Sequence, residues 1–226
     1  MSSFARPILA AFLLLTLSGC ASVPFARTEL APTLPRSAAA LNEGRWDAGK
    51  ENLLIRQSAL FELRGMKVPI TGIMKLDLAA KQARLVGMND MGVKFYDLSV
   101  TADSSEAHFV IPELDRYPDF ARAVALSVRR IFLAPTPSAG DLLKVTPTSY
   151  LLTRQEAGGK LRFTFGGADA QLLEKSFRGP AESWRVRYYQ YQRGQGRLFP
   201  GGIVLDDDQA GYRLTLWIES VENTDE

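Results

Sequence analysis

The stretch that decides the fold is NLLIRQSALFELRGMKVPITGIMKLDL, residues 52–78, in which apolar side chains recur at every second position. A period of two is that of a β-strand with one buried face and one solvated face. The apolar face comprises Leu53, Ile55, Ala59, Phe61 and Leu63 in the first half, and Val68, Ile70, Met74, Leu76 and Leu78 in the second. The pattern predicts two half-buried strands that open an antiparallel sheet.

Further strands are predicted on both sides of residues 102–147. The turn sequences AAKQ (79–82) and NDMG (89–92) bound strands near 83–88 and 93–101. In the latter, Val93 and Phe95 share one parity and Leu98 and Val100 the other, which indicates a bulge or burial on both faces. The remaining strands are predicted at 149–154, 160–165, 170–177, 184–193 and 211–220.

One segment, YPDFARAVALSVRRIFLAP (117–135), has the period of a helix instead. At 100° per residue its apolar side chains gather on one face, with arginines opposite. Pro118 and Asp119 suit a first turn, and Pro135 ends the pattern. We expect one amphipathic helix of about 15 residues. Its apolar face comprises Phe120, Val124, Val128, Ile131 and Phe132.

The predicted fold class is mainly β with one or a few helices. A sheet of this many strands curls because strands twist, so we expect a curled antiparallel sheet, an unclosed barrel, covered by the amphipathic helix. We expect residues 50–222 to form one domain with no internal repeat. The interior of such an unclosed barrel is either filled by side chains or hollow enough for a ligand.

The N-terminus has the layout of an export signal. Arg6 precedes an apolar run over 8–17, which is too short to be expected to span a bilayer, and small residues follow. Leu17-Ser18-Gly19-Cys20 resembles the lipobox of bacterial lipoproteins. That resemblance implies that residues 1–19 are a signal peptide and that Cys20, the only cysteine, is acylated. The alternatives are an ordinary secretory signal with an incidental cysteine, or a buried thiol.

The segment after the cysteine is rich in Ala, Pro, Ser and Thr and has no sustained apolar period. We therefore expect residues 20–49 to form a lipidated, flexible tether with a reach of about 30 Å. The resemblance to bacterial lipoproteins implies that Asp directly after the cysteine would retain the protein in the inner membrane. Ala21 stands at that position instead. The resemblance implies that the protein lies at the periplasmic face of a Gram-negative outer membrane. There it would be lipid-anchored through palmitate or a similar acyl group.

Residues for common catalytic chemistry are scarce. His108 is the only histidine, and acylation would remove the only thiol. LDDDQAG (205–211) lacks the alternating spacing of a calcium loop, so a hairpin turn is favoured. We expect no enzyme activity, no cofactor and no metal site. The formal net charge of +2 also gives no reason to expect a nucleic-acid partner.

Two further stretches are unusual in composition. Met66, Met74, Met88 and Met91 cluster in sequence, which indicates core filling, a pliable acyl-binding wall or an exposed hairpin tip. In residues 184–193, Trp184, Val186 and Tyr188 alternate with an outer stripe of Arg185, Arg187, Tyr189, Tyr191 and Arg193. A solvated strand face is the favoured interpretation of that stripe, and contact with phosphate or sugar head groups is the alternative.

The sequence of elements, with LSGC, the tether, the opening hairpin, the strands over 83–100 and the helix inserted in the sheet, resembles the LolA and LolB lipoprotein carriers. It is equally similar to uncharacterised outer-membrane lipoprotein families that share their fold. The resemblance implies an unclosed barrel whose apolar cavity holds acyl chains or lipidated cargo. The ligand-binding residues expected on this basis are Leu53, Ile55, Phe61, Val68, Ile70, Met74, Leu76, Phe120 and Val124.

The first functional hypothesis is thus a non-enzymatic lipid or lipoprotein carrier or receptor, with the membrane and its acylated cargo as partners. The alternative is a structural or assembly lipoprotein with a packed core, which contacts an envelope protein or glycolipid through Arg185 and Arg187. An envelope enzyme is a third hypothesis and would need two carboxylates that converge in a cleft.

Overall fold

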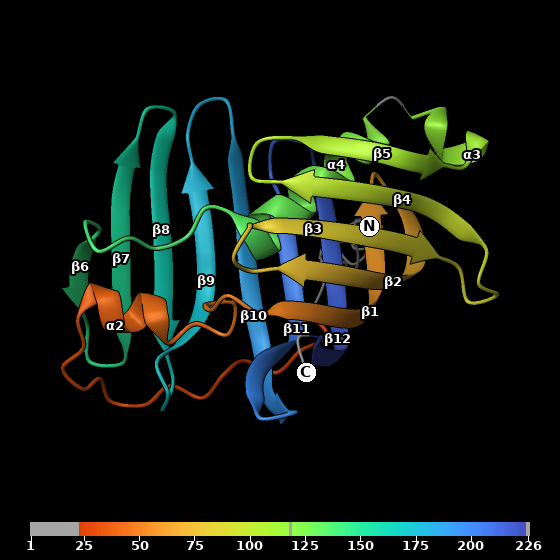
Figure 1. Cartoon of the computed structure of the whole chain (residues 1–226). Coiled ribbons are helices and arrows are strands. Elements are labelled where there is room, and N and C mark those ends of the chain that lie inside the picture. Colours follow the sequence, from red (N-terminus) through yellow and green to blue (C-terminus); the bar gives the residue numbers. More distant parts are fainter. Residues whose placement is uncertain (1–22, 118, 225–226) are drawn as a thin grey trace, which may run out of the picture.

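The protein, described by a computed structural model over residues 23–117 and 119–224, is built on one antiparallel sheet of 12 strands (Figure 1). The strand order is β5-β4-β3-β2-β1-β12-β11-β10-β9-β8-β7-β6, with β5 and β6 at opposite edges, so the curled sheet is an unclosed barrel. The strands are β1 Asn52–Leu63, β2 Met66–Asp77, β3 Gln82–Met88, β4 Lys94–Thr101, β5 Ser105–Val110, β6 Leu142–Val145, β7 Ser149–Glu156, β8 Gly159–Gly166, β9 Gln171–Arg178, β10 Ser183–Gly194, β11 Arg197–Asp207 and β12 Tyr212–Asn223. This confirms the predicted fold class.

The hairpin of β1 and β2 has the register that its alternating pattern requires. Ile55 lies opposite Met74, and Phe61 lies opposite Val68. Ile55 and Met74 have no exposed surface, so the predicted apolar face does point into the interior. The C-terminal strand β12 pairs with the other edge of β1, so the first and last strands lie side by side in the middle of the sheet.

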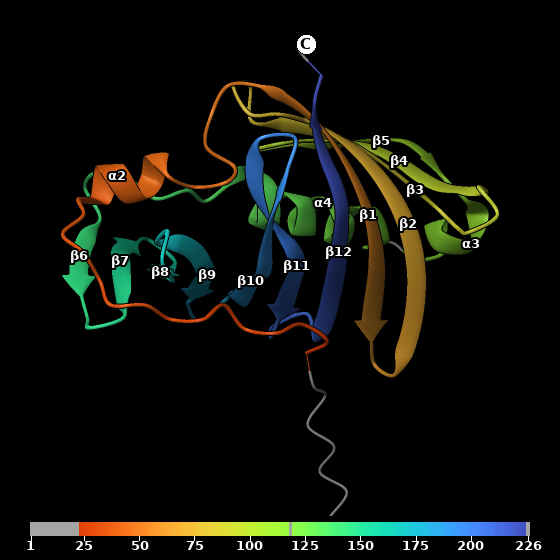
Figure 2. The same cartoon turned by 90° about the horizontal axis from the view of Figure 1, so that it is seen from below.

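Helix α4 (Phe120–Val128) continues into the π-helical turn η1 (Arg129–Leu133), and the two lie across the concave face of the sheet (Figure 2). This confirms the predicted amphipathic helix. The face that carries α4 is called the inner face below, and the opposite face the outer face. Two short helices, α2 (Ala38–Glu43) and α3 (Pro112–Asp115), complete the described elements.

The segment predicted to be a flexible tether instead packs on the rest of the domain at several points between residues 23 and 49. Phe25 is buried on the outer face against Tyr189 and Trp217. Further along, Leu41 and Trp46 are buried in the main core on the inner face. These three large apolar side chains anchor a segment whose overall Ala and Pro content indicated a tether. Residues 1–22, which include the predicted signal peptide and Cys20, lie outside the described part of the chain.

Candidate functional site

An apolar cavity lies between the inner face of the sheet and α4. Among its lining residues are Phe61 and Ile70 from β1 and β2, Tyr96 from β4, and Phe120 and Val124 from α4. Its volume is about 40 Å³, which is room for a few water molecules at most. The interior is therefore closed in this structure, and an acyl chain enters it only if α4 moves.

The nine residues predicted to bind a ligand divide into two groups. Phe61, Ile70, Phe120 and Val124 line the cavity. The others pack the core away from it: Leu53, Ile55, Met74 and Leu76 are no more than 1% exposed, and Val68 is half-buried against the same core. A ligand role for any of the nine stays a prediction, and the first group is the better placed for it.

The C-terminal half of the helical segment is fixed to the sheet by polar contacts. Arg130 Nη1 donates to Asp207 Oδ2 at 2.5 Å, and Arg130 Nη2 donates to Glu182 Oε1 at 2.8 Å. Tyr188 donates from its hydroxyl to the carbonyl of Ile131 at 3.0 Å. Because Arg130 and Asp207 are both buried, removing Arg130 would leave the Asp207 carboxylate without a cation, whereas Arg130 would keep Glu182 if Asp207 were removed.

One hydrogen bond holds the middle of the helix. The hydroxyls of Ser127 and Tyr212 lie 2.9 Å apart, and Ser127 Oγ also donates to the carbonyl of Ala123 at 2.8 Å. Burial raises the pKa of the Tyr212 hydroxyl, so it stays protonated at neutral pH. This pair is specific to the closed position of α4, since Tyr212 belongs to β12 and Ser127 to the helix.

The N-terminal half of α4 is held mainly by apolar contacts. The half-buried Phe120 packs edge-on against Tyr96, with ring centroids 5.6 Å apart. The side chain of the cap residue Asp119 accepts no hydrogen bond from the backbone of the helix, and its exposed carboxylate instead pairs with Arg122 at 2.9 Å. A motion that enlarges the cavity is therefore a swing of this half away from the sheet, with η1 as the fixed end.

Gln57 is a cavity residue that sequence reasoning missed. Its side chain is 5% exposed, and its Oε1 has no hydrogen-bond partner in the part of the chain that the structure describes. The register of β1 against β12 shifts between Arg56 and Gln57, and this irregularity accompanies a polar residue on an otherwise apolar face. A buried, unpaired carbonyl oxygen is an acceptor for a donor group on a ligand.

The hairpin tips beyond the cavity expose apolar side chains. Met66 follows the β1–β2 turn and is 42% exposed, while Met91 in the β3–β4 turn is 84% exposed. Both turns lie at the same end of the sheet, because β2 and β3 are antiparallel neighbours. Met74 is fully buried, so the methionine cluster supplies both core filling and exposed tips.

Lys175 of β9 is a second unusual group on the inner face. It lies opposite Phe163 and Val186 and is 1% exposed. Loss of hydration lowers the pKa of its ammonium group to about 7, although the carboxylate of Asp47 opposes the shift. Asp47 is itself buried and accepts from Arg45 Nε at 2.7 Å. Arg45 and Asp47 belong to the segment between α2 and β1, whose charges act on Lys175.

The other sequence candidates have structural partners. His108 Nε2 lies 2.7 Å from Ser99 Oγ at an exposed position. Asp206 pairs with Arg187 and Arg213, and Asp207 accepts the backbone N–H of Gln209 at 3.0 Å in the turn that the sequence predicted there. Within the described residues, no group of three or more His, Cys, Asp or Glu side chains could hold a metal ion.

The stripe predicted on the outer face of β10 is only partly there. Tyr189 packs against Phe25, but Tyr191 contacts the inner core and donates its hydroxyl to the carbonyl of Leu172 at 2.7 Å. The cause is an irregularity at Gln190, which has a positive φ of 50° and no partner in the β10–β11 register. It reverses the parity of the residues that follow.

Comparisons with solved structures connect this fold to known proteins. A LolA superfamily protein from Nitrosomonas europaea superposes with a TM-score of 0.55 at 8% identity, covering 85% of this chain and 96% of the other. A protein from Vibrio parahaemolyticus, described as an outer membrane lipoprotein-sorting protein domain, superposes with a TM-score of 0.52 at 8% identity. The match covers 83% of this chain and 91% of the other. A DUF1329 family protein from Desulfovibrio piger superposes with a TM-score of 0.55 at 7% identity, covering 83% of this chain and 90% of the other.

At these identities the similarity establishes a LolA-like fold. No protein-family model and no curated protein sequence matches the chain. Within the described residues, no helix combines the length and apolar character that a bilayer crossing requires.

Proposed function

We propose that this protein is a lipid-anchored, non-enzymatic carrier or receptor of the bacterial outer membrane, which binds acyl chains of a lipid or lipoprotein between its sheet and α4. The observation that carries the proposal is the apolar cavity under a helix whose polar contacts with the sheet lie in its middle and at its C-terminal end, while its N-terminal half packs through apolar contacts. The LolA-like fold supports a lipoprotein-related role, since one structural neighbour is described as a lipoprotein-sorting protein domain.

Binding proceeds by exchange of apolar contacts. When the N-terminal half of α4 swings outward, Phe120 and Val124 leave the inner face and an acyl chain takes their place against Phe61 and Ile70. Each buried methylene contributes about 0.8 kcal/mol, so a chain that buries ten of them gains about 8 kcal/mol against the cost of the lost helix contacts. Gln57 Oε1 then accepts a hydrogen bond from a hydroxyl or amide of the ligand.

A fluorescent fatty-acyl probe tests this proposal. The wild-type chain should bind the probe, whereas Ile70→Asp places a carboxylate in the cavity and should abolish binding. Val124→Asp makes the same change from the half-buried helix side and guards against misfolding of the first variant. The matched control is Lys75→Asp, on the same strand as Ile70 but exposed. Folded variants at Ile70 and Val124 that bind as wild type does would exclude this cavity as the site.

A further inference from the structure

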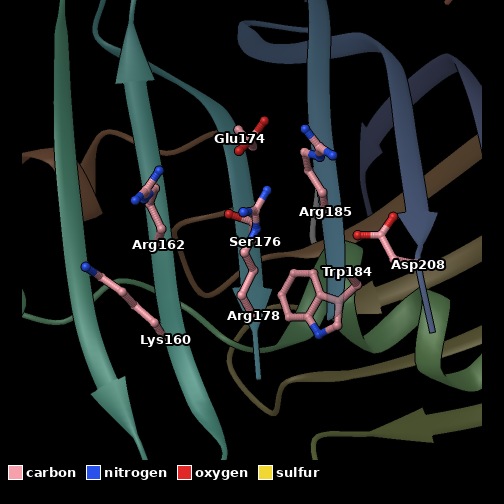
Figure 3. A pocket seen from close by; sticks show the side chains of 8 residues that line it. All are labelled: Lys160, Arg162, Glu174, Ser176, Arg178, Trp184, Arg185 and Asp208. Carbon is pink, nitrogen blue, oxygen red and sulfur yellow. The ribbon is translucent and has the colours of Figure 1, made fainter. Parts of the chain in front are cut away.

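A group of basic side chains on the outer face has no part in the cavity. Lys160, Arg162, Arg178 and Arg185, here called the basic patch, line a shallow hollow of about 120 Å³ on β8, β9 and β10 (Figure 3). None of the four side chains forms an ion pair or hydrogen bond with any residue that the structure describes. Glu174 and Asp208 also line the hollow, which leaves an excess of two positive charges.

The strand register brings these charges together. Arg162 and Arg185 lie on either side of Ser176 in one row across three strands, and Lys160 lies directly opposite Arg178 in the next row. Like charges opposite each other destabilise a sheet. An arrangement of this kind is stabilised by an external anion, and guanidinium groups match the geometry of phosphate.

The path of the N-terminal segment places the same face next to the membrane. Phe25 packs on Tyr189, four residues from Arg185 on the same face of β10 and therefore about 13 Å away. The segment then crosses the outer face, with α2 on the opposite side of the sheet (Figure 2). Cys20 precedes Val23 by three residues, at most about 10 Å of extended chain. An acyl anchor at Cys20 therefore holds the outer face close to the bilayer.

We propose that the basic patch docks on the phosphate-bearing headgroups of anionic lipids in the membrane that anchors the chain. This inference rests on the Cys20 anchor of the proposed function. Leu30, 53% exposed and close to Gly166 on the outer face, adds an apolar side chain to the contact. Docking holds the sheet with its outer face on the lipid, and α2 and the inner face turned away from it.

The test measures which face is near the lipid in the acylated full-length protein, reconstituted into phosphatidylglycerol–phosphatidylcholine vesicles. A fluorophore is attached at Thr153→Cys, on the outer face beside Arg162, or at Ala39→Cys in α2. A nitroxide on the lipid headgroup quenches whichever is close. We expect strong quenching at position 153 and weak quenching at 39, and loss of the difference in phosphatidylcholine alone or at high salt.

Charge reversal supplies the decisive variants. Each basic residue near an anionic surface contributes about fivefold to association, so Arg162→Glu with Arg185→Glu should lower the ratio of docked to undocked protein at least about 25-fold. The control is Arg64→Glu, an exposed charge in the β1–β2 turn, which should leave quenching unchanged. Equal quenching at 153 and 39, or no effect of the double reversal, would overturn the inference.

The remaining outcomes separate this inference from the proposed function. Mass spectrometry of the same protein reports acylation of Cys20, and its absence would remove the anchor on which docking rests. Loss of acyl-probe binding with quenching intact would contradict the proposed function alone. If inorganic phosphate binds the basic patch while lipid leaves position 153 unquenched, the patch is a site for a soluble anion and the docking proposal fails.

Discussion

Removal of one hydroxyl should make the protein bind acyl chains more tightly. Tyr212→Phe deletes the 2.9 Å hydrogen bond between Ser127 and Tyr212, which exists only while α4 is closed. Ser127 keeps its bond to the carbonyl of Ala123, so no buried donor is left unpaired. The phenylalanine ring retains the contact with Phe61, whose centroid lies 5.3 Å from that of Tyr212.

The expected magnitude follows from the coupling between closure and binding. A hydrogen bond of this kind contributes about 1 kcal/mol net, so its loss raises the small open fraction about fivefold. Apparent affinity scales with the fraction of binding-competent protein, and the dissociation constant should therefore fall about fivefold. The same change should lower the melting temperature by about 2–4 °C in a chain of this size.

Titration with a fluorescent acyl probe, together with thermal melting, measures both effects. Tyr150→Phe is the matched control, because its hydroxyl bonds to the carbonyl of Leu34 at 2.5 Å, in the N-terminal segment and away from α4. The control should lose stability without a change in affinity. Unchanged or weaker binding by Tyr212→Phe would refute the requirement that α4 opens.

Three further predictions concern buried polar groups. Arg130→Met leaves Asp207 buried without its cation and should lower the free energy of unfolding by about 3–5 kcal/mol, measured by urea denaturation; a loss below 1 kcal/mol would contradict it. Gln57→Leu removes an amide whose carbonyl oxygen is buried and unpaired and should raise the melting temperature while weakening the preference for acyl amides over hydrocarbons; a lower melting temperature would count against it. Lys175 has a pKa of about 7 in the folded state, below about 10.4 when unfolded. Between these values the unfolded chain binds more protons, so its contribution to stability rises with pH from 7 to 10 and is flat below 7. Lys175→Met should remove that rise and stabilise the protein at pH 7. Urea denaturation of the variant at pH 7 and pH 9 measures this, and a gain in stability with pH as large as that of the wild type would contradict the low pKa of Lys175.

The strands with clear alternation, and the helix, could be predicted from the sequence because their patterns are local. The strand β11 was missed, since Pro200, Gly201 and Gly202 argue against a central strand. The fold explains the two glycines: a Cβ at Gly202 would lie 2.5 Å from the Phe25 ring, and a Cβ at Gly201 would lie 3.0 Å from the carbonyl oxygen of Gln190. The short edge strand β6 is absent from the predicted strands because its residues lack a buried face.

The candidate site was predictable only in part. Alternation identified the inward face of β1 and β2, but which of its residues meet the cavity depends on where α4 crosses the sheet, which is a long-range property. Lys175 shares its parity with the core residue Phe177, and its burial is explained only by the covering segment with Asp47. The basic patch required the register of three strands, since Arg162 and Arg185 are far apart in sequence.

Native mass spectrometry of the full-length protein, extracted from a Gram-negative envelope, tests the central proposal most directly. We expect the chain to carry, besides the covalent acyl groups at Cys20, a noncovalently bound species with acyl chains, which Ile70→Asp loses and Lys75→Asp keeps. A protein that emerges without such a species, and that also rejects added fatty-acyl probes, would contradict a binding interior and leave a packed core that acts through its surface.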